Sequence, residues 1–188
     1  MSRRTAATFT ALAFAAITLT ACSSHVGGQA SPSPTAPGSS ASSTGATTDP
    51  SNPFAGLNQC TLLDQLLTGQ GFPKAEPARA DRTHTCHSQR YTGGSNENYD
   101  VNLGLHPGQK INENLNNPAQ AQNGKINGTR PSVRQPEPLN SKGQCQINLQ
   151  VATNSRAYVL VTSGLDTERA CTFAQQLAEK LDSQLPPS

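Results

Sequence analysis

Aromatic residues are scarce in this chain, and tryptophan is absent. Phenylalanine and tyrosine together make up only 4% of the 188 residues. A chain with so few bulky side chains builds a thin hydrophobic core, and small domains of that kind often depend on covalent cross-links. The scarcity therefore directs attention to the five cysteines.

An excess of positive charge is also missing once the N-terminal arginines are set aside. The formal net charge of +2 includes Arg3 and Arg4, and without them the basic and acidic residues number 12 each. A chain of this kind offers no basic patch to a phosphate backbone or to anionic lipid. We therefore expect neither nucleic-acid binding nor electrostatic attachment to a membrane.

Sequence signatures of catalysis and of cofactor binding are lacking too. The chain has no Gly-x-Ser-x-Gly element and no glycine-rich phosphate-binding loop. Serines beside glycines, at 93–95 and 163–164, have the composition expected of turns. The sequence predicts no catalytic residue and no cofactor, and a hydrolase would require a serine, a histidine and an acid to meet in the fold.

The N-terminus has the parts of an exported lipoprotein. Arg3 and Arg4 precede an apolar stretch at 6–19, which suits the core of a signal peptide and is too short to span a bilayer comfortably. The segment 19–22, Leu-Thr-Ala-Cys, resembles the bacterial lipobox. This resemblance implies cleavage before Cys22 and a lipid thioether on its sulfur, with further acylation of the palmitate type. We favour export by the general secretory route over the twin-arginine route.

Three regions follow from this pattern. Residues 1–21 are the expected lipoprotein signal peptide. Residues 22–51 combine the lipidated Cys22 with a tether of Ser, Thr, Pro, Ala and Gly, which has too little apolar content to fold and is open to O-glycosylation. Residues 52–188 have the length of one globular domain. We expect acyl chains on Cys22 to hold that domain at the outer, extracytoplasmic face of the cytoplasmic membrane.

The remaining cysteines are Cys60, Cys86, Cys145 and Cys171. An even number in an exported chain predicts disulfides, and three connectivities can join four cysteines. We favour Cys60–Cys86 and Cys145–Cys171. Each would close a loop of about 26 residues, a constraint worth roughly 3.5 kcal/mol in the chain-entropy description.

Hydrophobic periodicity predicts a helix near each end of the domain. The first is expected at 59–68 with Asn58 as its N-cap, and Gly69 and Gly71 should end it. The second begins after Asp166 or Thr167 and runs to the prolines at 186–187. A short helix at 106–115 is also expected.

Extended segments lie between these helices. The alternation of apolar and polar residues predicts strands at 83–91, 99–105, 125–133, 145–151 and 156–162, the last two forming a hairpin. A loop is expected at 116–125. The predicted fold class is α+β, a small antiparallel sheet with N-terminal and C-terminal helices packed on it and two disulfides bracing it.

Two motifs suggest sites but have simpler interpretations. His84, Cys86 and His87 resemble metal ligands, yet in a strand His87 would face away from the other two, and a disulfide would occupy Cys86. We therefore predict no metal site. The segment 127–129, Asn-Gly-Thr, matches an N-glycosylation sequon but suits a turn. The polar segment 112–127 suits either a ligand-facing or a solvated loop.

Four local patterns occur together along the domain. They are Cys60-Thr-Leu-Leu, Cys86 within a strand, Cys145-Gln-Ile-Asn-Leu, and Ala170-Cys171-Thr-Phe-Ala. Behind a lipobox and a Ser/Pro tether, they resemble a group of actinobacterial envelope lipoproteins classed as a domain of unknown function, similar to small mycobacterial Lpr-type lipoproteins. The resemblance covers most of 52–186 and departs at Ser88, where such proteins often carry tryptophan. It implies an envelope lipoprotein domain with no assigned catalytic residue or ligand.

Two functions are therefore expected for a membrane-anchored envelope lipoprotein. The first is a non-catalytic module that binds or senses a small molecule, a lipid or a wall fragment. The alternative is an accessory subunit that binds a neighbouring membrane protein complex. A binding module should contain a groove, whereas an interaction subunit should expose an apolar patch.

Overall fold

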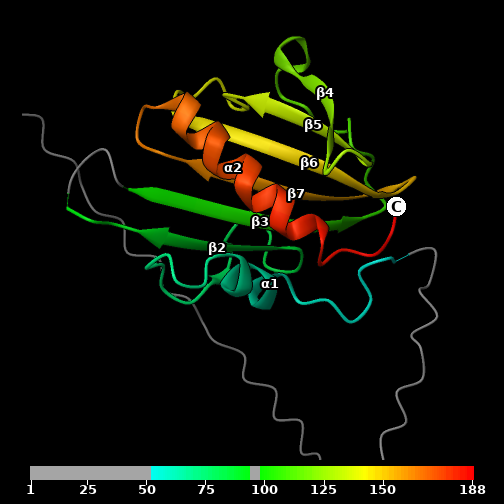
Figure 1. Ribbon diagram of the computed structural model, residues 1–188, viewed down its shortest axis with the longest axis horizontal. Coiled ribbons are helices and arrows are strands. Elements are labelled where there is room, and N and C mark those ends of the chain that lie inside the picture. The colour runs from blue at the N-terminus through cyan, green and yellow to red at the C-terminus, as the bar shows by residue number, and fades with distance from the viewer. Residues whose placement is uncertain (1–51, 94–97) are drawn as a thin grey trace, which may run out of the picture. The chain divides into compact units, whose positions relative to one another are not determined.

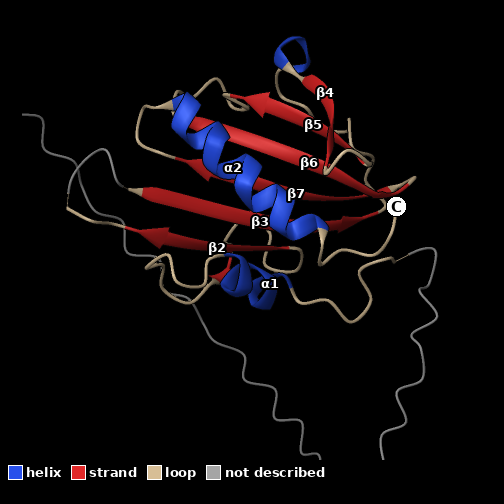
Figure 2. Ribbon diagram, viewed as in Figure 1, coloured by secondary structure: helices blue, strands red, loops and turns tan. Residues whose placement is uncertain are grey.

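The computed structural model describes residues 52–93 and 98–188. The chain order of its elements is α1 (Gln59–Leu66), β1 (Glu76–Pro77), β2 (Thr85–Arg90), β3 (Tyr99–Pro107), the 3-10 helix η1 (Pro118–Gln120), β4 (Gln122–Ile126), β5 (Arg130–Pro136), β6 (Gln144–Ala152), β7 (Ser155–Thr162) and α2 (Thr167–Asp182) (Figures 1 and 2). The predictions for the signal peptide, Cys22, the tether and Ser95 lie outside the described residues.

The strands form one antiparallel sheet. Its order is β1-β2-β3-β7-β6-β5-β4, so the predicted hairpin of β6 and β7 lies near its centre, beside β3. The α+β class predicted from the sequence is confirmed. None of the helices in the described part of the chain is long and apolar enough to cross a bilayer.

Both helices pack on the same face of the sheet. In Figure 1, α2 lies across β6 and β7, while α1 lies beside β2. The inward positions of β3 and β7 are fully buried there, as are those of β6. The core between these layers contains Val101, Leu103, Ile147, Leu149, Val159, Val161, Leu63, Leu66, Ala174, Leu177 and Leu181. The apolar alternation read from the sequence is therefore the core-facing half of each central strand.

Two disulfides attach the helices to this face. Cys60 of α1 is bonded to Cys86 of β2, and Cys145 of β6 is bonded to Cys171 of α2. This is the pairing favoured from the sequence. Each cross-link spans 26 residues, so each helix is fixed to a strand that lies far from it along the chain.

The helix caps agree with the sequence. The side chain of Asn58 accepts a hydrogen bond from the backbone N–H of Thr61, at 2.9 Å, and so begins α1. Asp166 accepts from the backbone N–H of Arg169, at 3.0 Å, and begins α2. Both satisfy a backbone donor that the helix itself leaves free. Helix α1 ends earlier than expected, at Leu66.

Three sequence predictions for the middle of the chain are wrong. No helix forms at 106–115, because β3 continues through Pro107 and Gly108 then turns the chain with a positive φ of 78°. The expected loop at 116–125 contains η1 and most of β4. The expected single strand at 125–133 is parts of two strands joined by the turn 127–129, in which Asn127 and Gly128 have positive φ values of 48° and 75°. Such an Asn-Gly pair favours a tight hairpin turn.

A buried ion pair fixes the end of α2 to β5, the strand next to the sheet edge. The Nε of Arg130 in β5 donates to Asp182, the last residue of α2, and the guanidinium also donates to the backbone oxygens of Gln150 and Pro186. Only 4% of Arg130 is exposed. Nearly complete pairing offsets the high cost of burying this charge.

Candidate functional site

The face of the sheet opposite the helices, called here the helix-free face, has a different composition. Because paired residues of neighbouring strands share a face, the strand registers place the following side chains on it: Thr85, His87, Gln89, Asp100, Asn102, His106, Gln144, Gln146, Asn148, Gln150, Arg156, Tyr158, Leu160 and Thr162. Most are polar and half-buried. A polar sheet face with several amide groups can exchange hydrogen bonds with a polar ligand.

Hydrogen bonds between these side chains fix some amide groups and leave others available. Gln89 and Asn102 each donate from the side-chain amide to Asp100, at 2.6 and 3.0 Å, and Gln146 donates to Asn148 at 2.7 Å. Among the described residues, the side-chain oxygens of Asn102 and Gln146 accept no hydrogen bond. These two oxygens are oriented acceptors that a ligand could use.

A shallow cavity of about 390 Å³ lies on this face next to the sheet edge. Strand residues His87, Gln89 and Asn102 line one side of it, and the segment 78–80, which follows β1, lines the other. Arg79 in that segment is exposed and makes no hydrogen bond or ion pair within the described part of the chain. The cavity therefore combines amide groups, an imidazole and an uncommitted positive charge, and is called here the β2–β3 groove.

Tyr158 lies flat on β3, beyond the groove. A Cβ atom at Gly104 would come within 2.1 Å of its ring, so the ring rests where a side chain would otherwise stand. Its hydroxyl is 3.1 Å from the hydroxyl of Thr85 in β2. Burial raises the pKa of Tyr158, although the hydrogen bond with Thr85 opposes the shift. The absence of a side chain at Gly104 thus lets β7 place an aromatic ring over β3.

Next to this ring, a carboxylate and two imidazoles come together. His106 of β3 stacks on Tyr158, with ring centroids 5.4 Å apart, and the ring of His84 lies 5.3 Å from that of His106. Asp81 accepts hydrogen bonds from the backbone N–H of His84 at 3.1 Å and faces its Nδ1 at 3.2 Å. The Nε2 of His106 is 3.8 Å from Asp81. One ligand atom from each of these three residues lies within 4.8 Å of the others.

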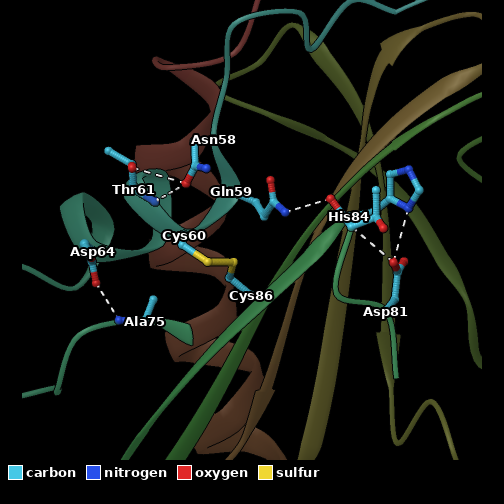
Figure 3. Close-up of a disulfide and its surroundings, with 10 residues drawn as sticks. Asn58, Gln59, Cys60, Thr61, Asp64, Ala75, Asp81, His84 and Cys86 are labelled. Atoms are coloured by element: carbon cyan, nitrogen blue, oxygen red, sulfur yellow. Dashed lines mark hydrogen bonds and ion pairs between the residues drawn. A yellow bond between two sulfur atoms is a disulfide. The ribbon is translucent and has the colours of Figure 1, made fainter. Parts of the chain in front are cut away.

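Helix α1 positions the turn that carries Asp81 and His84. The side chain of Gln59 donates to the backbone oxygen of Thr83, at 2.8 Å. Gln59 lies beside the Cys60–Cys86 disulfide (Figure 3). The disulfide fixes the first residues of β2, and the backbone oxygen of His84 accepts from Leu105 of β3, at 2.9 Å. The turn is therefore fixed by α1 on one side and by β3 on the other.

The electrostatics of this cluster favour a charged Asp81 and a neutral His106. Burial raises the pKa of Asp81, but the hydrogen bonds from His84 and the nearby imidazoles outweigh burial and leave it below its usual value. Burial lowers the pKa of His106, and the positive charge of Arg156 on the neighbouring strand lowers it further. Neutral imidazole and charged carboxylate are the forms that bind cations.

The segment after β3 covers one end of the helix-free face. The guanidinium of Arg156 donates to the backbone oxygen of Glu113 at 2.8 Å and to the side chain of Gln109 at 3.1 Å. The buried Asn148 donates to the backbone oxygen of Ile111 at 3.3 Å. The segment 109–113 therefore covers part of β6 and β7. It does not line the β2–β3 groove, which stays open.

The structure separates the residues that the sequence grouped. Cys86 is in a disulfide and His87 lines the groove, whereas His84 joins Asp81 and His106 instead. Sequence reasoning missed His106 because it placed this residue in a helix. The alternation 100, 102, 104, 106 along the strand could have found it. In the sequon segment, the Asn127 amide donates to Asp182 and to Glu179.

Comparison with known proteins identifies a family but no activity. Residues 17–184 match the model of the family described as Protein of unknown function (DUF3558). The matched span includes Cys22 and all four disulfide cysteines. No curated protein and no solved structure matches the chain.

Proposed function

Because the chain belongs to this family of proteins of unknown function, we propose a function from its own residues: a non-catalytic envelope module, anchored by lipid on Cys22, that binds a polar fragment of the cell wall. The observation that carries the binding role is the β2–β3 groove, where Arg79, His87 and Asn102 surround a cavity of about 390 Å³. Cavities of this size are typical of small-ligand sites.

The anchor is supported by the N-terminal residues. The apolar stretch at 6–19 and the lipobox-like segment 19–22 suit export and lipidation, and the family match begins ahead of Cys22. The balanced charge of the remaining chain leaves lipid as the means of attachment. Together with the four cysteine-centred patterns of the domain, these features support the finer assignment to actinobacterial envelope lipoproteins, at the outer face of the cytoplasmic membrane.

The chemistry of the helix-free face favours a wall fragment over a lipid. Leu160 is the main apolar side chain at its surface, and amide groups surround it. Amide groups both donate and accept, so they suit sugar hydroxyls, N-acetyl groups and peptide bonds. Arg79 adds a positive charge that suits a peptide carboxylate. An acyl chain would instead need an apolar channel.

The non-catalytic part of the proposal rests on what the histidines contact. His84 is hydrogen-bonded to the carboxylate of Asp81, and His106 stacks on Tyr158. Within 52–93 and 98–188, no serine, threonine or cysteine side chain is hydrogen-bonded to an imidazole. A nucleophile activated by a base would show such a contact, so the arrangement favours binding.

Metabolic labelling tests the anchor. Cells that express the full chain are supplied with an alkyne analogue of palmitate, and we expect the label on the wild-type protein and none on Cys22→Ser. Cys22→Ser should also leave the membrane fraction. A labelled, membrane-bound Cys22→Ser protein would contradict lipidation at this residue.

Titration with soluble muropeptides tests the groove. The full chain in detergent micelles is expected to bind them, and Arg79→Ala and Asn102→Ala should each weaken binding by about tenfold, because each removes a polar contact worth about 1.5 kcal/mol. Arg82→Ala and Asn123→Ala are the matched controls, since both residues are exposed and outside the groove. Equal binding by all four variants would reject the groove, as would recovery of a co-purifying lipid with no muropeptide binding.

A protein-interaction role is favoured by one observation. Leu139 and Leu165 are 57% and 83% exposed, in the loops that follow β5 and β7. The two loops contact each other: the backbone N–H of Ser163 donates to the backbone oxygen of Gly143, at 2.8 Å. If they bind an envelope protein, crosslinking in intact cells should recover a stable neighbour that Leu165→Ser loses. Recovery of the same neighbour with Leu165→Ser would count against this surface.

A further inference from the structure

We propose that Asp81, His84 and His106 form a binding site for a divalent transition-metal ion such as Zn²⁺. This site goes beyond the muropeptide groove, because its residues lie outside the groove lining. It is built from two segments that the sequence keeps 22 residues apart, the turn before β2 and the end of β3. The pairing of β2 with β3 brings them together.

The distances suit a metal ion. In a tetrahedral Zn²⁺ site with bonds of about 2.0–2.1 Å, neighbouring ligand atoms are about 3.3 Å apart. Here Asp81 Oδ1 and His84 Nδ1 are 3.2 Å apart, and Asp81 Oδ2 and His106 Nε2 are 3.8 Å apart. With one ligand atom taken from each residue, the three atoms lie within 4.8 Å of one another. Side-chain rotations that shorten the longer separations toward about 3.3 Å would complete the geometry.

An unsatisfied nitrogen points to a ligand. The side chain of His106 is only 12% exposed, and its Nε2 makes no hydrogen bond within the described residues. The closest carboxylate oxygen, at 3.8 Å, is beyond hydrogen-bonding distance. Buried polar atoms normally have partners. An ion between His106 and Asp81 would satisfy both.

The three ligands are held before any ion arrives. Asp81 and His84 belong to one turn, which Gln59 and the Cys60–Cys86 disulfide hold against α1. His106 is fixed by its place in β3 and by stacking on Tyr158. Ligands that are already ordered lose little entropy on binding.

The donor set selects a class of ion. Two imidazoles and one carboxylate suit Zn²⁺ and its transition-metal neighbours, whereas Ca²⁺ and Mg²⁺ need mostly oxygen ligands. Three protein ligands leave a position for water or another ligand. The guanidinium of Arg156, on the strand beside His106, would weaken binding of a bare cation and favour an anion in that position.

Cobalt spectroscopy tests the site. The full chain, purified without a histidine tag in detergent micelles, is titrated with Co²⁺ and then with competing Zn²⁺. We expect one Co²⁺ per chain, with the visible absorption of a tetrahedral site. Asp81→Asn, His84→Gln and His106→Gln should each raise the dissociation constant at least about tenfold, because even supporting residues of metal sites have effects of this size.

The other two histidines provide the controls. His87→Gln and His25→Gln should bind Co²⁺ within twofold of the wild type. Imidazole nitrogen NMR of the wild-type chain gives a readout that does not depend on whether a variant folds: Zn²⁺ should shift His84 and His106 and leave His87 unmoved. The proposal is overturned if His87 or His25 shifts instead, if the control variants lose as much affinity, or if no binding occurs below millimolar Zn²⁺.

Discussion

The two faces of the sheet use the same strands for different purposes. The face under α1 and α2 is apolar and fully buried, and both disulfides lie on it. The helix-free face is mostly polar and half-buried, and several of its side chains are hydrogen-bonded to one another while others have no such partner among the described residues. Because side chains alternate along a strand, neighbouring residues such as Asn102 and Leu103 belong to different faces. Alternate residues of the same strands thus belong either to the buried, cross-linked face or to the polar face.

The largest effect should come from the covalent cross-link of the helix-covered face. Replacing Cys145 and Cys171 by alanine frees α2 from β6, and the 26-residue loop predicts a loss of about 3.5 kcal/mol in the free energy of unfolding. Urea unfolding of the full chain measures it. A loss below about 1 kcal/mol would mean that the packing of α2 alone holds that face together.

Truncating one leucine on each face compares how much the two faces contribute to the free energy of unfolding. Leu103 is fully buried beneath the helices, so Leu103→Ala should lower the free energy of unfolding by about 3 kcal/mol. Leu160 lies half-buried on the helix-free face, and Leu160→Ala should cost less than about 1 kcal/mol. Equal losses in urea unfolding would show that the helix-free face is also a core.

A methyl group at Gly104 should disturb the helix-free face alone. Its Cβ would come within 2.1 Å of the Tyr158 ring, which must then leave Thr85 and His106. Overpacking of this kind typically costs about 1–3 kcal/mol. Near-ultraviolet circular dichroism of Gly104→Ala should change in the tyrosine region, while far-ultraviolet spectra stay the same. An unchanged tyrosine signal would place the ring elsewhere.

Acid should weaken the fold through His106. Its pKa in the folded chain lies below the unfolded value of 6.5, because of burial and the charge of Arg156. Between the two values the unfolded chain binds more protons, so the free energy of unfolding is unaffected above about pH 6.5 and decreases below it. Asp81, whose pKa lies below 3.8, acts in the same direction but only at lower pH.

Urea unfolding with a chelator present, from pH 7.5 to 5, measures how the free energy of unfolding depends on pH. For one titrating group, the slope cannot exceed about 1.4 kcal/mol per pH unit. The groups around His106 are Asp81, His84, Arg156 and Tyr158. His106→Gln should flatten the slope. A wild-type chain that gains stability on acidification would contradict the burial of a neutral His106.

The sequence predicted the helix-covered face better than the helix-free one. Apolar alternation and side-chain caps are local signals, and they identified β6, β7 and the start of both helices. The favoured disulfide pairing also joins segments of this face, since Cys145 of β6 is bonded to Cys171 of α2. The Asn127-Gly128 pair also carried a local hairpin signal. It was overlooked because one continuous strand was predicted at 125–133.

The helix-free face depends on which strands become neighbours. Asp81 and His84 are close in sequence, but His106 meets them only through the pairing of β2 with β3. The Tyr158 ring needs Gly104 opposite it, and that requires β7 beside β3. Neither pairing leaves a local signal in the sequence, so the groove and the cluster of Asp81, His84 and His106 could be recognised only in the fold.

Mapping a ligand by NMR tests the separation of the two faces most directly. The full chain in micelles, labelled with ¹⁵N, is titrated with soluble muropeptides, and backbone and side-chain amide signals are followed. We expect shifts at His87, Gln89, Asn102 and the Arg79 segment, and none at the buried residues of α2 such as Leu177. Shifts confined to α2 or to the loops of Leu139 and Leu165, or no shift at millimolar ligand, would contradict the assignment of binding to the helix-free face.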